Sequence, residues 1–400
     1  MQQDSVTEQK NLIQIGVPGE LHPRERRVAV VPELISSYAD SGFQLSIEAG
    51  AGRQSDFSDE EYKSKGANIV STRDELFGAC DIILQVRPLT GEPSTTSPDL
   101  QLLKKGQKII GFFDPIRKTA LIQEIASAGV VSFSIELMPR ITKAQSMDAL
   151  SSQATVAGYK AVLLAAELSS KMFPLLMTAA GTVSPVHLLV IGAGVAGLQA
   201  IATAKRLGAV VSAYDVRPEV KEQVESLGAK FIELDIQDTD TEAGSGYARE
   251  MGKEFYERQR ELMAAAVSKS DVVITTAAVP GKKAPVLIDE QMLKQMQFGS
   301  IIMDLAADSG GNCQLTRPGR TVEQHGVKIA GPLDVAATTP HHASQLYSRN
   351  LYNFVKHLSS NEPVNPDNED EIIRGTLLTY DGNIVNQKVM EILNSNPTVA

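Results

Sequence analysis

Three glycines near the middle of the chain are spaced in a way that could bind a phosphate group. Gly192, Gly194 and Gly197 form the pattern GxGxxG, which follows the apolar run HLLVI and precedes an alanine-rich segment. Between a strand and a helix, the first glycine permits a tight turn, the second admits a pyrophosphate and the third lets the helix pack on the strand. The N–H groups of the helix that starts at Val195 then face the phosphates. The pattern predicts a dinucleotide site, and a glycine-rich turn without a ligand is the alternative.

An acidic residue follows these glycines at the distance that ribose recognition requires. Asp215 ends the next expected strand, about 20 residues after the turn. Its carboxylate can accept hydrogen bonds from ribose hydroxyls and would repel a 2′-phosphate. This predicts a preference for NAD(H) over NADP(H), although the nearby Arg217 argues for the opposite choice.

A second group of polar side chains lies in the segment MPRITKAQSMDALSSQ, which covers residues 138–153. Arg140, Gln145, Asp148 and Ser151 all belong to it. One interpretation is an interdomain loop that carries a capping ion pair between Arg140 and Asp148. The other is a functional loop that faces the cofactor, and the residues alone leave both interpretations open.

A third segment, DIQDTDTEAGSGY at residues 235–247, is acidic and contains glycine and serine. Connections of this length are commonly functional lids or disordered. Tyr247 at its end could close over a nucleotide or pack against the following helix, and both interpretations stay open.

Several other kinds of chemistry are disfavoured by the sequence. The six histidines form no HExxH motif and no metal-ligand spacing, so no metal site is expected. There is no GxSxG or Walker A motif, and the two cysteines lie far apart. A net charge of −10 argues against nucleic acid as a partner. The polar start, and the lack of about 20 consecutive apolar residues, predict a cytoplasmic-type chain that does not insert into a membrane.

These segments must be positioned by two series of alternating strands and helices. The first series runs from residue 12 to about 137 and the second begins at His187. Alternation of this kind predicts parallel sheets with helices on both faces. A helical segment at 146–171 connects the two series, and another at 341–358 leads the chain back. We therefore predict an α/β protein of two Rossmann-like doubly wound domains, joined by long helices, with a cleft between them.

The first predicted domain comprises residues 1–145 and 343–400, and the second, which holds the nucleotide, comprises residues 146–342. The expected strands are 12–17, 44–48, 67–70, 81–86, 108–113 and 130–135 in the first domain, and 187–191, 210–215, 230–233, 271–276, 300–304 and 327–330 in the second.

Longer stretches of the sequence resemble a known family. The most specific are ELMPRITKAQSMDALSSQ, MTAAGTV, GAGVAGLQAIATAKRLGAVV, KEQVESLGAKF, GYAREMG and LAADSGGNC. On these segments the chain resembles the NAD(H)-binding alpha subunits of proton-translocating NAD(P) transhydrogenases, in the split form whose membrane domains are separate polypeptides. The resemblance extends over residues 12–390 and implies two Rossmann-like domains, the second of which binds NAD(H).

The resemblance also assigns roles to individual residues. It implies that Arg140, Gln145 and Asp148 are the catalytic loop residues and that, with Ser151, they hold the nicotinamide end of the nucleotide. The adenosine end is expected at the glycine turn and at Val195, Asp215, Val216 and Arg217, and a mobile loop is expected to carry Gly246 and Tyr247.

The same resemblance implies partners. It implies that NADP(H) is bound by a separate beta subunit, that hydride passes from NADH to NADP⁺, and that membrane-spanning segments of another subunit move the proton. It also implies a homodimer, held at the cytoplasmic or equivalent side of a membrane through those partner subunits.

Alanine dehydrogenases are related to this family and supply a competing hypothesis. Arg27, in RRVAVVP, stands where those enzymes bind the substrate carboxylate. However, the segment of their catalytic lysine is LQVRP here (84–88), and that of their catalytic histidine is GFFDPI (111–116), so both residues are missing. Oxidation of an amine needs a proton acceptor, whereas hydride transfer between two nicotinamides does not. The sequence therefore favours a transhydrogenase, with an alanine-type dehydrogenase and a non-catalytic NAD(H)-binding module as alternatives.

Overall fold

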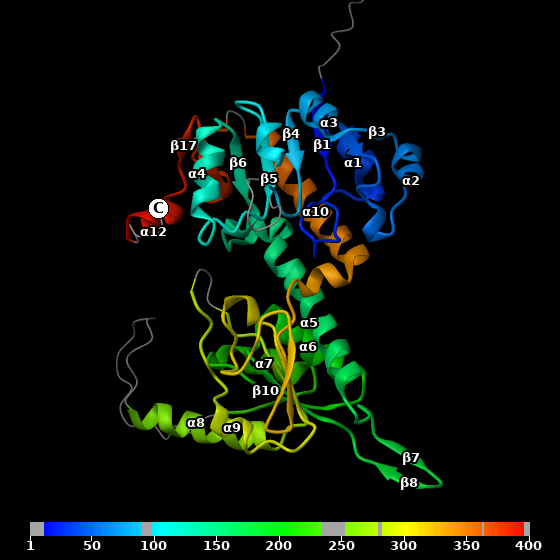
Figure 1. Cartoon of the computed structure of the whole chain (residues 1–400), viewed down its shortest axis with the longest axis vertical. Helices are drawn as coiled ribbons and strands as arrows, with labels where there is room; N and C mark the ends of the chain where they lie inside the picture. Colours follow the sequence, from blue (N-terminus) through cyan, green and yellow to red (C-terminus); the bar gives the residue numbers. More distant parts are fainter. Residues whose placement is uncertain (1–11, 90–97, 234–252, 279–281, 362–363, 396–400) are drawn as a thin grey trace, which may run out of the picture. The chain divides into compact units, whose positions relative to one another are not determined.

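The computed structural model describes residues 12–89, 98–233, 253–278, 282–361 and 364–395, and it divides into two compact units. Unit 1 consists of residues 1–153 and 337–400, and unit 2 of residues 154–336. Each unit is an α/β structure around its own sheet (Figure 1). The predicted fold class is confirmed.

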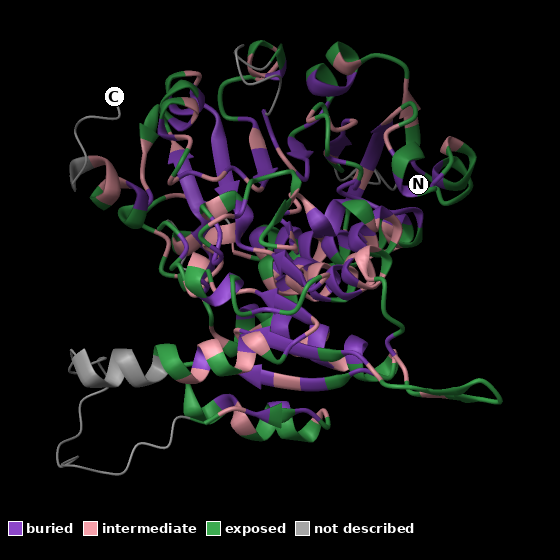
Figure 2. Cartoon of the chain, turned by 60° about the horizontal axis from the view of Figure 1, so that its bottom comes forward, coloured by how far each residue is buried: buried purple, intermediate pink, exposed green. Residues whose placement is uncertain are grey.

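Unit 1 is built on an eight-stranded sheet with the strand order β17-β16-β6-β5-β4-β1-β2-β3. Its parallel strands are β1 (Ile13–Val17), β2 (Phe43–Glu48), β3 (Asn68–Val70), β4 (Ile82–Leu84), β5 (Lys108–Gly111) and β6 (Val131–Ser134). The edge strands β16 (Leu377–Tyr380) and β17 (Asn383–Ile384) are antiparallel and come from the C-terminal region of the chain. The strands are buried along most of their length (Figure 2), which explains their nearly continuous apolar sequences.

The helices of unit 1 follow the amphipathic segments of the sequence. They are α1 (Ile35–Asp40), α2 (Asp59–Ser64), α3 (Arg73–Ala79), α4 (Thr119–Ser127), α10 (Pro340–Ser359), α11 (Glu371–Thr376) and α12 (Gln387–Ser395). Helix α10 buries Tyr347, Leu351 and Phe354 completely in the core of this unit. The return of the chain to the first domain is therefore driven by the burial of one face of α10.

Unit 2 has a seven-stranded sheet with the order β11-β10-β9-β12-β13-β15-β14. Its strands are β9 (His187–Ile191), β10 (Val210–Tyr214), β11 (Lys230–Phe231), β12 (Val272–Thr275), β13 (Ile301–Asp304), β15 (Val327–Ala330) and the antiparallel edge strand β14 (Thr321–Gln324). Its helices are α6 (Val195–Arg206), α7 (Lys221–Ser226), α8 (Lys253–Ser268) and α9 (Glu290–Leu293). The long helix α5 (Ala149–Leu168) begins in unit 1 and continues into unit 2.

The sequence analysis did not predict one element of unit 2, a hairpin of β7 (Leu176–Thr178) and β8 (Gly181–Val183). The hairpin extends away from the rest of its unit and is exposed along its length (Figures 1 and 2). The side chains of Met177 and Leu175 are 78% and 54% exposed. Among the described residues, no helix is long and apolar enough to cross a membrane.

Candidate functional site

The glycine turn of unit 2 has the geometry that its sequence predicts. Gly192 follows β9 with a φ of +98°, and a Cβ atom there would lie 2.6 Å from Oγ1 of Thr276. A Cβ on Gly197 would lie 1.8 Å from the carbonyl oxygen of Gly192, so the helix can approach the turn only without a side chain. A Cβ on Gly194 would meet no heavy atom within 4 Å, which leaves open space beside that residue. Two of the glycines are therefore required by packing, and the third borders space that a phosphate could enter.

Helix α6 presents its N-terminus at this turn. Gly194 is its N-cap residue and supplies no side-chain hydrogen bond to the first turn. The first N–H groups of a helix lack partners within the helix and carry partial positive charge, so they bind anions well. Val195, the first residue of α6, is 43% exposed. The strand order around β9 and β12 also puts the turn at the point where the direction of sheet growth reverses, which is where open α/β sheets bind ligands.

Asp215 connects the end of β10 to this turn. Its Oδ2 accepts a hydrogen bond from the N–H of Ala193 at 2.7 Å, and its Oδ1 accepts one from the N–H of Arg217 at 2.9 Å. The guanidinium of Arg217 also bonds both carboxylate oxygens. Burial would raise the pKa of Asp215, but the hydrogen bonds from Arg217 and Ala193 hold the pKa below its ordinary value. A charged carboxylate is thus in place near the turn, beside the exposed Val216.

The loop of unit 1 that carries Arg140, Gln145 and Asp148 is ordered by its backbone. A short 3₁₀ helix covers Thr142–Met147 and leads directly into α5. Asp148 caps α5, because its Oδ1 accepts from the N–H of Ser151 at 2.9 Å and its Oδ2 accepts from the Ser151 hydroxyl at 2.6 Å. Asp148 is therefore bonded to Ser151, and no ion pair to Arg140 is present within the described chain.

Arg140 and Gln145 are both exposed, and neither side chain is hydrogen-bonded to any described residue. The structure thus brings Asp148 and Ser151 into direct contact and leaves Arg140 and Gln145 available to other molecules. Gly246 and Tyr247 lie outside the described residues.

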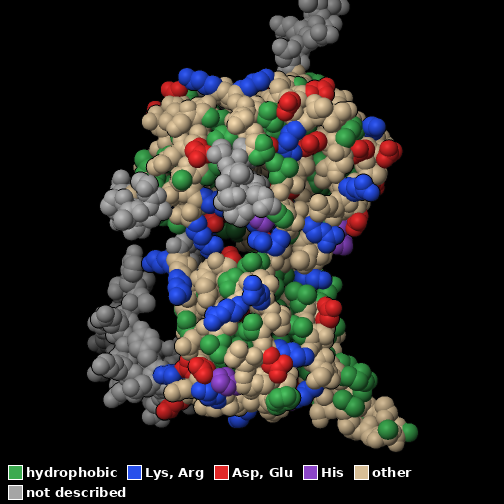
Figure 3. Space-filling model, in the orientation of Figure 1, with side chains coloured by type: hydrophobic (Ala, Val, Ile, Leu, Met, Phe, Trp, Pro, Cys, Tyr) green, Lys and Arg blue, Asp and Glu red, His purple; other side chains and the backbone are tan. Residues whose placement is uncertain are grey.

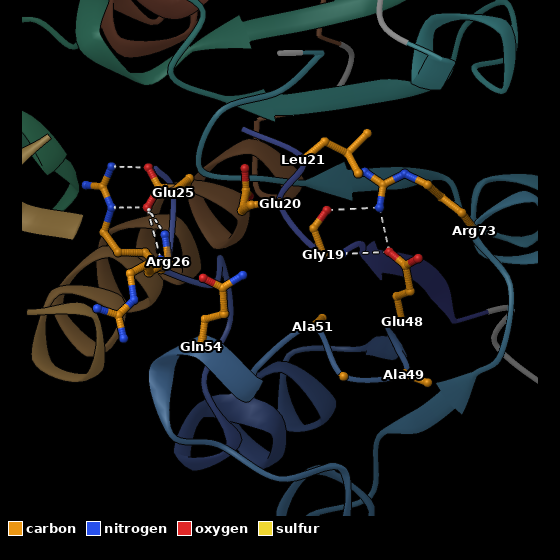
Figure 4. Close-up of a pocket in the computed structure, with 12 residues that line it drawn as sticks. Gly19, Glu20, Leu21, Glu25, Arg26, Glu48, Ala49, Ala51, Gln54 and Arg73 are labelled. Carbon is orange, nitrogen blue, oxygen red and sulfur yellow. Dashed lines mark hydrogen bonds and ion pairs between the residues drawn. The ribbon is translucent and has the colours of Figure 1, made fainter. Parts of the chain in front are cut away.

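The sequence analysis missed a buried ionic cluster in unit 1 that surrounds Arg27 (Figure 4). The guanidinium of Arg27 bonds both oxygens of Glu25 at 2.7 and 2.6 Å and donates to Oε1 of Gln153 at 2.8 Å. Arg87 donates to Glu25 as well, at 2.9 Å. Glu25 and Arg27 are 1% and 6% exposed. The glutamates in GELHPRERR were the signal, because a buried arginine requires carboxylate partners close by.

Unit 1 repeats the strand order of unit 2, so the same kind of ligand position exists where β1 adjoins β4. Here no glycine-rich turn and no helix N-terminus follow β1 directly. Glu20 occupies the position instead and accepts from the N–H groups of Val86 and Arg87 at 2.6 and 3.0 Å. The adjoining cavity is only about 180 Å³ and is lined by Glu20, Glu25, Glu48, Arg26, Arg27 and Arg73, among others. This arrangement explains why only unit 2 has the features of a dinucleotide site.

Glu20 should make the stability of the protein depend on pH. Burial, and then the neighbouring Glu25, raise the pKa of Glu20 to about 7, against the two N–H bonds that lower it. The folded state therefore binds this proton more tightly than the unfolded state, and the stabilisation is lost as pH rises through 7. We expect the free energy of unfolding to fall by up to about 3 kcal/mol between pH 5 and 8 on this account. In urea titrations, Glu20→Gln should remove that component of the slope, whereas Glu60→Gln, at an exposed position, should not. Equal slopes in Glu20→Gln and the wild type would contradict the assignment.

The LAADSGGNC segment supports the nucleotide turn from the neighbouring strands. Asp304 ends β13 and accepts from Thr275, Thr316 and the N–H of Cys313. Asn312 accepts from the N–H of Ala277 and donates to its carbonyl oxygen. Because Ala277 follows Thr276, whose hydroxyl bonds Gly192, these contacts lead from β13 to the turn. Among the described residues, no group of three or more His, Cys, Asp or Glu could hold a metal ion.

Comparison with known families accounts for both units. The model of the alanine dehydrogenase/PNT N-terminal domain matches residues 16–157, and that of the C-terminal domain matches residues 161–387. The chain belongs to the alanine dehydrogenase/PNT family. Within this family it is similar to an NAD(P) transhydrogenase subunit alpha chain of Rhodospirillum rubrum, at 45% identity over 93% of this chain and 98% of the relative. The corresponding protein of Rickettsia prowazekii is 42% identical over 92% of this chain and 94% of the relative.

Solved structures of the alanine dehydrogenase/PNT family have the same fold. A transhydrogenase from Sinorhizobium meliloti superposes with a TM-score of 0.81 at 40% identity, and the match covers 94% of this chain and 99% of that structure. An L-alanine dehydrogenase superposes with a TM-score of 0.79 at 22% identity and covers 96% of this chain and 99% of that structure. The second likeness concerns the fold alone. The resemblance inferred from the sequence is confirmed.

Proposed function

We propose that this chain is the NAD(H)-binding alpha subunit of a proton-translocating NAD(P)⁺ transhydrogenase. The observation that carries the proposal is its 45% identity to a transhydrogenase alpha subunit over nearly the full length of both proteins. The relatives support an oxidoreductase role and NAD(H) binding. In the proposed reaction, NADH bound to this chain donates a hydride to NADP⁺ on the beta subunit, and membrane-spanning segments of a separate subunit move the proton.

The glycine turn fits a dinucleotide. The N–H groups at the start of α6 would bind the pyrophosphate beside Gly194, where a Cβ atom would find open space. Asp215 would accept bonds from the adenosine ribose, with Val195, Val216 and Arg217 around it, and Gly246 and Tyr247 would cover the nucleotide. NADH supplies the hydride from its dihydronicotinamide ring.

The loop residues of unit 1 would act at the nicotinamide end. Arg140 and Gln145 have exposed side chains that are not hydrogen-bonded to the described residues, so no internal contact must break before they bind. Asp148 and Ser151 hold each other at the start of α5 and would set the position of this loop. Arg140 and Asp148 would hold the ribose and nicotinamide, and Gln145 would orient the ring. Direct hydride transfer needs correct placement and exclusion of water, and no acid or base from this chain.

The first unit also bears on the alternative of an alanine-type dehydrogenase. Alanine dehydrogenases are among the relatives, at 28% identity over 78% of this chain, and Arg27 stands where such an enzyme binds a carboxylate. Here the Arg27 guanidinium is already bonded to Glu25 and Gln153 inside the protein. A substrate carboxylate would have to displace these buried partners, at a cost typical of breaking a buried ion pair. This arrangement favours the transhydrogenase.

The proposal includes a homodimer and a peripheral position at a membrane, held there by the partner subunits. The hairpin of β7 and β8 supports the dimer, because its exposed apolar side chains need a protein surface to cover them. Figure 3 shows hydrophobic side chains along this hairpin.

The proposed function is tested by hydride transfer from NADH to an NADP⁺ analogue, with the chain alone and with the separately expressed NADP(H)-binding subunit. We expect a rate only when both are present. No rate with the partner, despite NADH binding, would overturn the proposal. A rate with alanine or pyruvate as the second substrate would support the alanine-type dehydrogenase instead, and NADH binding without any turnover would support a non-catalytic module.

The nucleotide preference depends on Asp215. Replacing it by Ser should remove the acceptor for the ribose hydroxyls and release the Arg217 guanidinium, which is then free to bind a 2′-phosphate. We expect NADH to bind about 10-fold more weakly and NADPH about 10-fold more tightly, a change of roughly 1.4 kcal/mol each. Fluorescence titration of both reduced nucleotides checks this. An unchanged ratio of the two dissociation constants would show that Asp215 does not select the nucleotide.

A further inference from the structure

Asn350 of α10 joins two segments of unit 1 through the opposite ends of its side-chain amide. Its Nδ2 donates to the carbonyl oxygen of Ser146 at 2.8 Å, and its Oδ1 accepts from the hydroxyl of Ser152 at 2.7 Å. Ser146 directly follows Gln145, and Ser152 lies in the first turn of α5. We propose that Asn350 is a positioning residue for hydride transfer, which holds the backbone that carries Gln145. This inference rests on the proposed function of the loop.

The loop needs such a contact because its functional side chains are not held directly. Gln145 and Arg140 are exposed and make no hydrogen bond within the described residues, so only the backbone can determine where they start. Ala144 and Met147 anchor the loop in the core at 1% and 7% exposure. Apolar anchors fix the depth of a segment but have no directional preference. The hydrogen bond to the Ser146 carbonyl adds the direction, because such bonds weaken steeply away from linearity.

Two other polar contacts reach the same loop, but both lie in solvent. Asn353 donates to the same carbonyl oxygen at 3.2 Å and is exposed. Lys143 pairs with Asp370 at 3.2 Å, and the lysine side chain is 66% exposed. Exposed pairs contribute little, since water competes for them and long side chains lose entropy. Asn350 is 8% exposed, so its bond is the best protected of the three.

The amide of Asn350 is itself oriented by a buried chain of hydrogen bonds. The Ser152 hydroxyl, which bonds Oδ1, accepts from Nε2 of Gln153 at 3.3 Å. Oε1 of Gln153 in turn accepts from Arg27, which is paired with Glu25. This chain requires an acceptor on the Ser152 side of residue 350 and a donor on the Ser146 side. Asparagine meets both requirements, and aspartate meets only the first.

The test is therefore Asn350→Asp in the full chain, assayed with the NADP(H)-binding subunit. The new carboxylate keeps the Ser152 contact and places negative charge against the Ser146 carbonyl. We expect hydride transfer to fall about 10-fold or more in kcat, with the KM for NADH changed less than about 2-fold. Hydrogen exchange of the backbone amides in residues 140–148 should be faster in the chain without nucleotide.

Gln107→Glu is the matched control. Gln107 is 5% exposed in the same unit, and its Nε2 donates to the carbonyl oxygens of Phe77 and Cys80 at 2.9 and 2.8 Å. It imposes the same chemical change on a buried amide away from the loop, so it should lower stability without changing kcat or the exchange of residues 140–148. Ser152→Ala, which only removes the hydroxyl that orients Asn350, provides a milder variant with a smaller decrease of about 3-fold.

The outcomes separate the two proposals. Wild-type kcat and wild-type exchange of residues 140–148 in Asn350→Asp would overturn the role of Asn350, as would an equal loss of kcat in Gln107→Glu. If the wild type with its partner transferred no hydride at all, the proposed function would fail, whereas faster exchange of residues 140–148 in Asn350→Asp would still establish the contact that holds the loop.

Discussion

Replacement of Gly197 by Ala is expected to abolish measurable NADH binding and to destabilise unit 2. The added Cβ would lie 1.8 Å from the carbonyl oxygen of Gly192. The turn cannot simply move away, because that oxygen also accepts a hydrogen bond from Thr276 at 3.0 Å. We expect the dissociation constant for NADH to rise at least roughly 100-fold and the free energy of unfolding to fall by about 1–3 kcal/mol. Nucleotide fluorescence titration and urea unfolding measure the two effects.

Gly194→Ala is the matched control for this prediction. Its Cβ would meet no heavy atom within 4 Å, and Gly194 has a φ of −75°, which any residue can adopt. The stability of the protein should therefore be unchanged or slightly higher. NADH binding should still weaken, because the new methyl group would occupy the space that the pyrophosphate needs. If Gly197→Ala bound NADH like the wild type, or if Gly194→Ala had no effect on binding, the assignment of the turn would be wrong.

Replacement of Gln145 by Asn is expected to reduce hydride transfer sharply while NADH binding and stability change little. The side chain is exposed and has no hydrogen bond among the described residues, so shortening it should not cost folding energy. If it orients the nicotinamide ring, a displacement of about 1 Å should slow the reaction by roughly 10- to 100-fold. Single-turnover transfer to an NADP⁺ analogue on the partner subunit measures the rate.

The control for Gln145→Asn is the same change at Gln123, which is exposed on helix α4. It should leave both the transfer rate and the NADH dissociation constant unchanged. An unaffected rate in Gln145→Asn would remove this residue from the mechanism. A large rise in the NADH dissociation constant would instead assign it to binding.

The strands could be predicted well because each is short, apolar and bounded by turn residues. His187–Ile191 and Val327–Ala330 have the predicted bounds, and the other predicted strands differ at their ends. The strand expected at 81–86, for example, ends at Leu84, because the N–H groups of Val86 and Arg87 bond Glu20. The antiparallel edge strands and the exposed hairpin were not predicted. Their pairing depends on contacts between segments, and short strands carry weak patterns by themselves.

The dinucleotide turn was determined by local sequence, because steric demands on Gly192 and Gly197 act within six residues of chain. The position of Asp215 followed from the fixed length of a strand–helix–strand unit. The ionic cluster around Arg27 could not be predicted, because its partners Arg87 and Gln153 are distant in the sequence. Asn350 likewise reaches Ser146 only because helix α10 packs into the core of the first unit. Backbone sterics and hydrophobic periodicity are local properties that a sequence displays, whereas the partner of a buried polar group is chosen by the packing that brings distant segments together.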